Sequence, residues 1–205
     1  MRQHVRSFAM ACLCCAFPAT VAAQQDVRAN EWGRGTTLNG FVGVVADSSQ
    51  SGPAVGGAMG WELRPNLAIE GEGAWAEFGH GTTSFAGAIK ARLRVAGKRH
   101  VDPYVSGGVG LYRATFGAED SAIPGFYLRR MTTPAAGRAA ARTFTDPTVV
   151  GGGGVNVFLN RRVALRPDVE AAFVLRDGRS HVVTTVALHA VYHFESHPVT
   201  PGSGR

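Results

Sequence analysis

The stretch "RVALRPDVEAAFVL" (Arg162–Leu175) combines an apolar face with a densely charged one. Every second residue from Val163 onward is apolar, whereas the alternate positions include Arg166, Asp168 and Glu170. Because successive side chains of a β-strand point to opposite faces, this alternation predicts a strand. Such a strand needs an apolar environment on one side and balancing charges on the other.

Eight segments of this kind follow one another along the chain, separated by Gly, Pro, Asn, Asp and Ser. Three connections are compact, at residues 64–66, 97–102 and 160–162, whereas residues 113–147 form one long connection. An even number of strands, short turns on one side and a longer loop on the other are typical of a transmembrane barrel. The long connection is then an extracellular loop between the fifth and sixth strands.

Alternation alone does not say which face points outward, because a soluble lipocalin-like barrel alternates as well. Here the charged parity is crowded with Gly and Ala, as a narrow interior requires, and the apolar parity is almost free of charge. Its aromatic residues, such as Trp61, Trp75 and Tyr192, lie near segment ends, where the aromatic girdles of membrane barrels lie. We therefore predict an all-β fold, an eight-stranded antiparallel transmembrane up-and-down β-barrel.

The first 23 residues have the order of a secretory signal peptide, with a basic start, a short apolar run and a small-residue cleavage site. All three cysteines lie within it, and Cys12 comes too early for a lipoprotein signal. We predict a signal peptide at 1–23, a barrel domain at 24–194 and a short polar tail at 195–205. Without Arg2 and Arg6 the net charge falls from +6 to +4, which does not suggest nucleic acid as a partner.

The inward parity of these segments carries five acids and five bases, all in the predicted periplasmic half. We expect them to form an ion-pair network that plugs the barrel, since a buried unpaired charge is very costly and an eight-stranded barrel is narrow. The predicted network consists of Glu62, Arg64, Glu70, Glu72, Lys90, Arg92, Arg94, Arg166, Asp168 and Glu170.

Three stretches together resemble the OmpA/OmpX-type outer-membrane β-barrel domain family: "VDPYVSGGVGLYR" (Val101–Arg113), "GGGGVNVFLNRRVALRPDVE" (Gly151–Glu170) and "VALHAVYHF" (Val186–Phe194). The resemblance implies the cell outer membrane of a Gram-negative-type bacterium, contact with outer-membrane lipid and lipopolysaccharide, and a monomer. It also implies biogenesis through periplasmic chaperones and the barrel assembly machinery. The last stretch resembles the terminal assembly signal, although "ESHPVTPGSGR" follows it here; the signal residues are Leu188, Tyr192 and Phe194.

The long connection holds four arginines that are candidate contacts for lipopolysaccharide phosphates: Arg129, Arg130, Arg138 and Arg142. A short helix beginning near Thr133–Pro134 would place the last two on one face. A solvated loop face explains the same arginines equally well.

Neither a metal site nor a cofactor site is expected. His189 and His193 share the inward face of the last strand, but no third ligand joins them, so partners for the interior carboxylates are the better interpretation. Some small barrels are lipid-modifying enzymes, yet Ser180 and His181 are adjacent and therefore point to opposite faces.

The leading functional hypothesis is a non-enzymatic outer-membrane barrel that contributes to envelope structure and surface interaction. The alternative is a barrel with an outward-facing apolar vestibule that binds or admits small hydrophobic molecules, and a lipid-modifying enzyme is third. The vestibule would be lined by small inward residues above the charges, such as Ala74, Ala76, Ala86, Ala88 and Val183.

Overall fold

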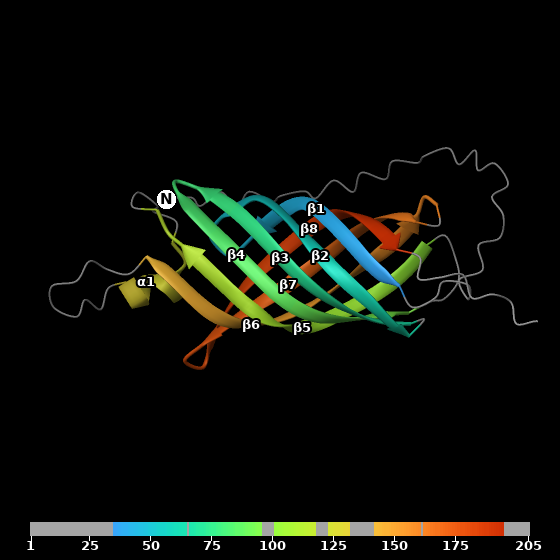
Figure 1. Ribbon diagram of the computed structural model, residues 1–205. Coiled ribbons are helices and arrows are strands. Elements are labelled where there is room, and N and C mark those ends of the chain that lie inside the picture. Colours follow the sequence, from blue (N-terminus) through green and yellow to red (C-terminus); the bar gives the residue numbers. More distant parts are fainter. Residues whose placement is uncertain are drawn as a thin grey trace, which may run out of the picture.

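The computed structural model describes residues 35–64, 66–95, 101–117, 123–131, 142–160 and 162–194. Eight strands form one closed antiparallel barrel in which each strand pairs with its neighbours in the sequence, and a single short helix lies at one end (Figure 1). The predicted up-and-down barrel is thereby confirmed. The elements are β1 (Thr36–Ala46), β2 (Ser51–Arg64), β3 (Leu67–Gly79), β4 (Thr82–Arg94), β5 (Val101–Thr115), α1 (Gly125–Met131), β6 (Thr143–Phe158), β7 (Val163–Arg176) and β8 (Arg179–Phe194).

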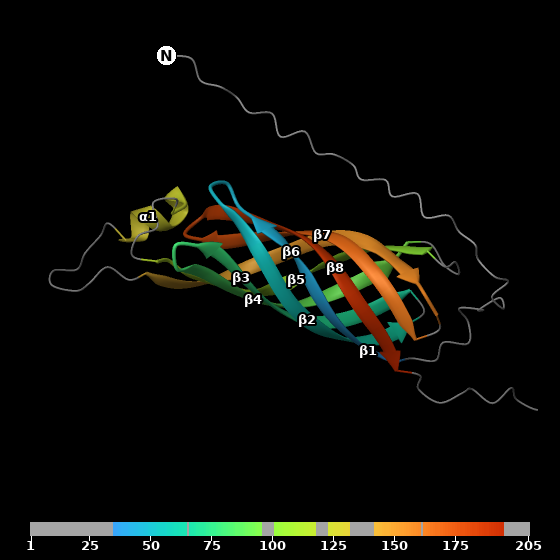
Figure 2. The same cartoon turned by 90° about the horizontal axis from the view of Figure 1, so that it is seen from above.

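The barrel closes where its first and last strands meet. β1 pairs with β8 along its whole length, from Thr36 opposite Phe194 to Ala46 opposite Thr184. Both described ends of the chain therefore lie at one end of the barrel, called here the terminal end, and α1 lies at the other, called the helix end (Figure 2). No strand edge is left open among the strands that the structure describes, which is the arrangement that a lipid environment demands.

The outer wall is apolar. Side chains of the predicted outward parity are largely exposed, for example Val42 at 63%, Ile89 at 65% and Val109 at 64%. The inward parity is buried and carries most of the polar groups of the strands. A water-soluble barrel would have the reverse distribution, so this wall is built to face lipid. Within the described ranges, no helix is long and apolar enough to cross a bilayer.

Glycine allows neighbouring strands to approach closely inside this narrow barrel. A Cβ at Gly108 would overlap the carbonyl oxygen of Ile89, and one at Gly110 would overlap that of Gly87. Both glycines face inward, where β4 and β5 curve tightly against each other. The glycines of "SGGVG" (Ser106–Gly110) thus allow the barrel wall to curve tightly.

The predicted long loop is shorter than expected. β5 continues to Thr115 and β6 already begins at Thr143, so both strands extend into the segment 113–147. The start of β6 was not predicted because Pro147, Thr143 and Thr145 occupy positions of the outward parity, which is mostly aliphatic elsewhere in the barrel. Residues 118–122 and 132–141, with the helix predicted near Thr133, lie outside the described residues, as do the predicted signal peptide and the predicted tail.

We expect a charge placed in the middle of the apolar wall to destabilise the barrel. Ile89 lies halfway along β4 and is 65% exposed, so an Ile89→Arg substitution should lower the free energy of unfolding in lipid vesicles by about 2–4 kcal/mol. Ile89→Leu is the matched control and should remain close to the unsubstituted protein. An arginine tolerated as well as leucine would contradict a lipid-facing wall.

Candidate functional site in the barrel interior

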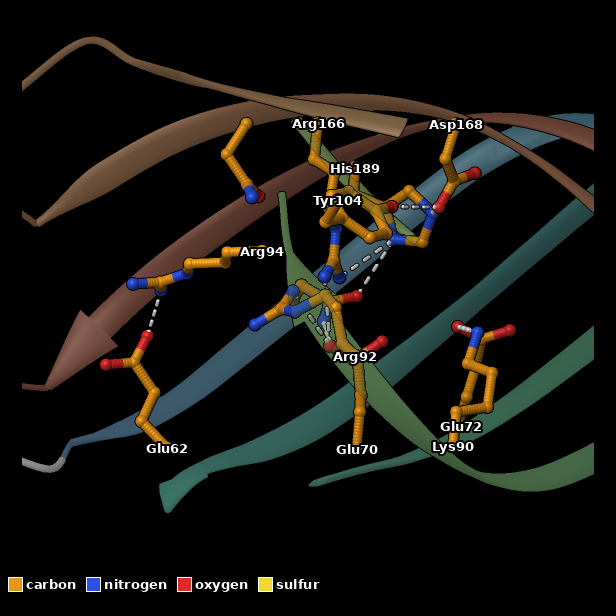
Figure 3. A network of polar contacts seen from close by, with 12 residues as sticks. Glu62, Glu70, Glu72, Lys90, Arg92, Arg94, Tyr104, Arg166, Asp168 and His189 are labelled. Atoms are coloured by element: carbon orange, nitrogen blue, oxygen red, sulfur yellow. Dashed lines mark hydrogen bonds and ion pairs between the residues drawn. The ribbon is translucent and has the colours of Figure 1, made fainter. Parts of the chain in front are cut away.

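Glu70 lies at the centre of the buried charges. Its Oε2 atom accepts hydrogen bonds from Nη1 of Arg166 at 3.0 Å, from Nη1 of Arg92 at 3.4 Å and from Nδ2 of Asn39 at 3.4 Å. These partners come from β7, β4 and β1, so one carboxylate of β3 joins strands from opposite walls of the barrel (Figure 3). Glu70, Arg92 and Arg166 are each at most 3% exposed.

A second chain of bonds leads from Asn39 to Asp168. Oδ1 of Asn39 lies 3.0 Å from Nδ1 of His189, and Nε2 of the same imidazole lies 3.0 Å from Oδ2 of Asp168. Tyr104 donates its hydroxyl to Oδ2 of Asp168 at 2.9 Å. Nδ1 of His189 also lies 3.5 Å from Nη2 of Arg166, so this imidazole contacts both the Asp168 side and the Glu70 side of the network.

Tyr104 also supports the two central arginines. The guanidinium groups of Arg92 and Arg166 lie 5.5 Å and 5.7 Å from the centroid of its ring. Those distances fall within the range of cation–π attraction. Tyr104 thus contacts the acidic and the basic parts of the network at once.

Lys90 holds two carboxylates together closer to the middle of the barrel. Its Nζ atom lies 2.7 Å from Oε2 of Glu72 and 2.7 Å from Oε2 of Glu170. At the terminal end, Arg94 forms ion pairs with Glu62 and with Asp102, the latter at 3.1 Å between Nε and Oδ2. Figure 3 shows Glu62 with Arg94, the Glu70 centre, and Glu72 with Lys90 following one another in that order.

Nine of the ten predicted network residues lie together in this interior. The hairpin at Gly79–Gly81 brings β3 against β4, with Glu70 directly opposite Lys90. The ion pairs nevertheless run diagonally, from Glu70 to Arg92 and from Glu72 to Lys90.

Arg64 lies outside the network. It is exposed at the end of β2, where an irregularity in the pairing between Glu62 and Arg64 shifts the register. The predicted balance of five acids and five bases therefore changes. In the described part of the chain this network holds six carboxylates, those of Glu62, Glu70, Glu72, Asp102, Asp168 and Glu170, and four permanent cations, those of Lys90, Arg92, Arg94 and Arg166.

Sequence reasoning missed Asn39, Asp102 and Tyr104. Asp102 and Tyr104 share the parity opposite to Val101 and Val105, so extending the alternation of β5 backward by two positions would have found both. The sequence prediction instead ends the compact connection at Asp102. Asn39 carries no charge, and nothing in its local sequence marks it as a network member.

A small cavity lies between the network and the helix end. Its volume is about 50 Å³, and its lining joins small apolar side chains such as Ala76 and Ala88 to Lys90, Glu72 and Glu170. This volume exceeds the roughly 10–15 Å³ that one water needs, but it is far below the roughly 300–1,000 Å³ of a typical ligand pocket.

An aromatic cap covers the helix end of the interior. Tyr127 of α1 is 1% exposed and lies 4.9 Å from the ring of Phe116 and 5.5 Å from that of Phe144. These three rings belong to one apolar cluster with Tyr112, Val174 and other inward residues. We call Phe116, Tyr127 and Phe144 the aromatic cap.

Charged bonds fasten α1 to the barrel. Arg130 of α1 donates from Nη1 to Oδ2 of Asp146 at 2.7 Å, and Arg176 at the end of β7 donates to Oδ1 of the same carboxylate at 2.7 Å. The guanidinium of Arg130 also lies 4.1 Å from the centroid of Phe144. Asp146 is 1% exposed, so its charge depends on these two arginines.

His181 forms a second attachment. Its ring is stacked on Phe126 of α1 at 5.7 Å, and its Nε2 atom lies 3.4 Å from Oδ2 of Asp47 in the β1–β2 connection. Burial alone would raise the pKa of Asp47, but hydrogen bonds from His181, Ser49 and Gln50 outweigh that effect and hold the pKa below its ordinary value. The charged form of Asp47 is therefore favoured in the folded protein.

The open vestibule expected in this half is reduced to the small cavity under the aromatic cap. Most of the residues predicted to line it do face the cavity, including Ala74, Ala86 and Val183. The cap was not foreseen because Phe116 and Phe144 were assigned to the long loop, whereas they continue β5 and β6 inward.

The arginines predicted to contact lipopolysaccharide do not form one group in the described part of the chain. Arg130 points to Asp146 and Phe144 under the cap, whereas Arg129 is exposed on α1. Arg142 donates to the carbonyl oxygen of Gly117 at 2.5 Å. Arg138 lies outside the described residues.

The predicted assembly residues lie on the outward face of β8. Leu188, Tyr192 and Phe194 are 47%, 39% and 48% exposed, and the rings of the last two meet edge to face at 4.9 Å.

No group of three or more potential metal ligands occurs in the described part of the chain. Ser180 is exposed and His181 buried, so the two lie on opposite faces as expected.

Comparison with solved structures identifies the architecture. Neisserial surface protein A superposes with a TM-score of 0.58 at 11% sequence identity, over 78% of this chain and 97% of that one. The fold is that of the small bacterial outer-membrane β-barrels. The N-terminal β-barrel domain of Pseudomonas aeruginosa OprF matches with a TM-score of 0.55 at 14% identity, over 79% of this chain and 99% of that one.

The predicted resemblance to outer-membrane barrels is confirmed at the level of the fold. No family model matches the sequence, and no curated protein matches it either.

We expect removal of the Glu70 carboxylate to destabilise the barrel strongly. Glu70→Ala leaves Arg92 and Arg166 buried without their shared acceptor, which typically costs about 3–5 kcal/mol of unfolding free energy. Glu77→Ala is the matched control, because Glu77 is an exposed acid near the other end of the same strand. Its effect should stay within about 0.5 kcal/mol. Equal effects of the two substitutions, measured by unfolding in urea, would contradict a structural role of the Glu70 centre.

The bond between Arg130 and Asp146 should control how often α1 leaves the barrel. The backbone N–H of Tyr127 donates to the carbonyl of Pro124 at 2.8 Å, so its hydrogen exchange reports on α1. Arg130→Gln should speed that exchange by about tenfold, since a hydrogen bond to a charged group contributes about 1.5–3 kcal/mol. Exchange within β5 should not change, and Arg113→Gln, on the outer wall, should leave both sites unaltered. An unchanged Tyr127 rate in Arg130→Gln would show that the aromatic contacts alone hold α1.

Proposed function

We propose that this protein is a non-enzymatic bacterial outer-membrane β-barrel that contributes to envelope structure and surface interaction, with an interior closed to ions. The observation that carries this proposal is the pairing of a lipid-facing apolar wall with an interior crossed by two layers. One layer is the ion-pair network around Glu70, and the other is the aromatic cap.

The outer-membrane location agrees with the fold and with the sequence of the N-terminus. Residues 1–23 act in this proposal as an export signal that is removed, 24–194 as the barrel domain and 195–205 as a tail. The terminal end of the barrel then faces the periplasm, where odd-numbered strands begin, and the helix end faces the cell exterior. α1 and the β7–β8 turn become the surface available to partners.

The closed interior argues against a transport function. A permeating ion would have to break the bonds of Glu70 and then pass the cap, where Asp146 and its two arginines hold α1 in place. The residues around the cavity that could carry chemistry, among them Lys90, Glu72 and Glu170, bond to one another. The described interior thus supports a structural role better than an enzymatic one.

The proposed partners are outer-membrane lipid and lipopolysaccharide, with the protein present as a monomer. Biogenesis would use periplasmic chaperones and the barrel assembly machinery, which would read Leu188, Tyr192 and Phe194. Their outward position on β8, beside the seam with β1, supports a recognition role, because the edge of β8 that faces β1 remains unpaired until the barrel closes.

Fractionation and electrophysiology test this function together. We expect the protein in the outer-membrane fraction as a heat-modifiable species, and we expect no stable ion conductance when it is inserted into planar bilayers. Glu77→Gln, which changes an exposed charge outside the barrel interior, serves as the control for insertion and should behave identically.

Two results would refute separate parts of the proposal. Recovery of the protein as a soluble periplasmic species would refute the location. Reproducible channels from the unsubstituted protein would refute the closed interior while leaving the location intact.

A further inference from the structure

A single arginine occupies the outward face of the strands near the helix end, within the part of the chain that the structure describes. Arg113 lies near the end of β5, is exposed, and follows the exposed Leu111 at the next outward position. The apolar wall of β5 therefore ends between these two residues. Of the described acids, none forms an ion pair with Arg113.

Four threonines surround this arginine, one on β5 itself and three on the neighbouring strands. Thr145 of β6 lies directly opposite Arg113, and Thr115 of β5 lies opposite Thr83 on one side and Thr143 on the other. The hydroxyl oxygens of Thr115 and Thr143 are 3.2 Å apart. Directly opposed residues have Cβ atoms about 4.5–5.5 Å apart, so the five side chains form one surface, which we call the threonine–arginine patch.

The remainder of the wall near the helix end differs in character. Its outward positions are mostly apolar, for example Val44 on β1, Pro53 on β2, Leu175 on β7 and Val182 on β8. The acid Glu77 faces outward on β3, opposite Thr83 and therefore on the side of the patch away from β6. An anion would accordingly lie over β5 and β6.

The position of the patch matches the depth of lipid headgroups. Phe85, directly opposite Arg113 on β4, is 53% exposed, and outward aromatic residues at the edge of an apolar wall typically mark the membrane interface. At that depth an arginine fork binds phosphate through two parallel hydrogen bonds, and hydroxyl groups supply further donors.

We propose that the threonine–arginine patch binds the phosphate group of a glycolipid of the outer leaflet. The proposal rests on the outer-membrane location proposed above. Arg113 and the hydroxyls of Thr115, Thr143 and Thr145 contact the phosphate, and the acyl chains of the same lipid lie against Leu111 and Val149 below it. The barrel then has one preferred side for this lipid, over β4 to β6.

Lipid binding by purified protein in detergent tests the patch. Native mass spectrometry should detect bisphosphorylated lipid A bound about tenfold more tightly than the same lipid A without phosphates. One hydrogen bond between charged groups changes an affinity by about tenfold. Arg113→Gln should reduce binding of the phosphorylated lipid to the level of the phosphate-free form. Arg179→Gln, which removes an exposed cation at the start of β8, should bind like the unsubstituted protein.

Several outcomes would overturn the assignment. Equal binding of the two lipids would show that the acyl chains alone carry the interaction, and equal binding by Arg113→Gln would exclude the patch. Tight binding of inorganic phosphate alone would identify a site for free anions instead of a lipid. Heat modifiability of each variant verifies that its barrel is folded. Because the measurement uses purified protein, its result is independent of the fractionation that tests the location.

Discussion

A chain that crosses a bilayer with strands has to satisfy every backbone N–H and C=O group within the protein, because hydrocarbon offers no partner. The pairing of β1 with β8 over their common length meets that demand. Everything else in this molecule depends on that closure. The alternation of side chains becomes a division between lipid and interior only once the sheet has no edge, and the eight strands then determine how narrow the interior is.

The narrow interior explains both the small residues and the charged ones. Close strand approach at Gly108 and Gly110 leaves little volume, so charged side chains that point inward meet one another rather than water. Each carboxylate of the network therefore has a cation or a donor within reach. His189 adds a link to this network, because it lies between the Asp168 carboxylate and Asn39.

Much of this architecture could be predicted from the sequence, because a period of two residues is a local property. The strands and their outward faces both follow from it. The ends of strands were harder to predict: Pro147 and the threonines of β6 interrupt the aliphatic pattern, so Phe144 and Asp146 were assigned to a loop. Partners across the barrel could not be predicted, since the bond between Glu70 and Arg166 depends on how the sheet curves and staggers when it closes.

The network also connects parts of the chain that are remote in sequence. Glu70 and Arg166 are 96 residues apart, and Asn39 and His189 are 150 apart. Such bonds stabilise the fold only after the intervening chain has lost the conformational entropy of loop closure. Folds dominated by distant pairings therefore form slowly. The bonds of Glu70 to Arg166 and of Asn39 to His189 therefore form only when the barrel closes, whereas the Glu72–Lys90 pair requires only the β3–β4 hairpin.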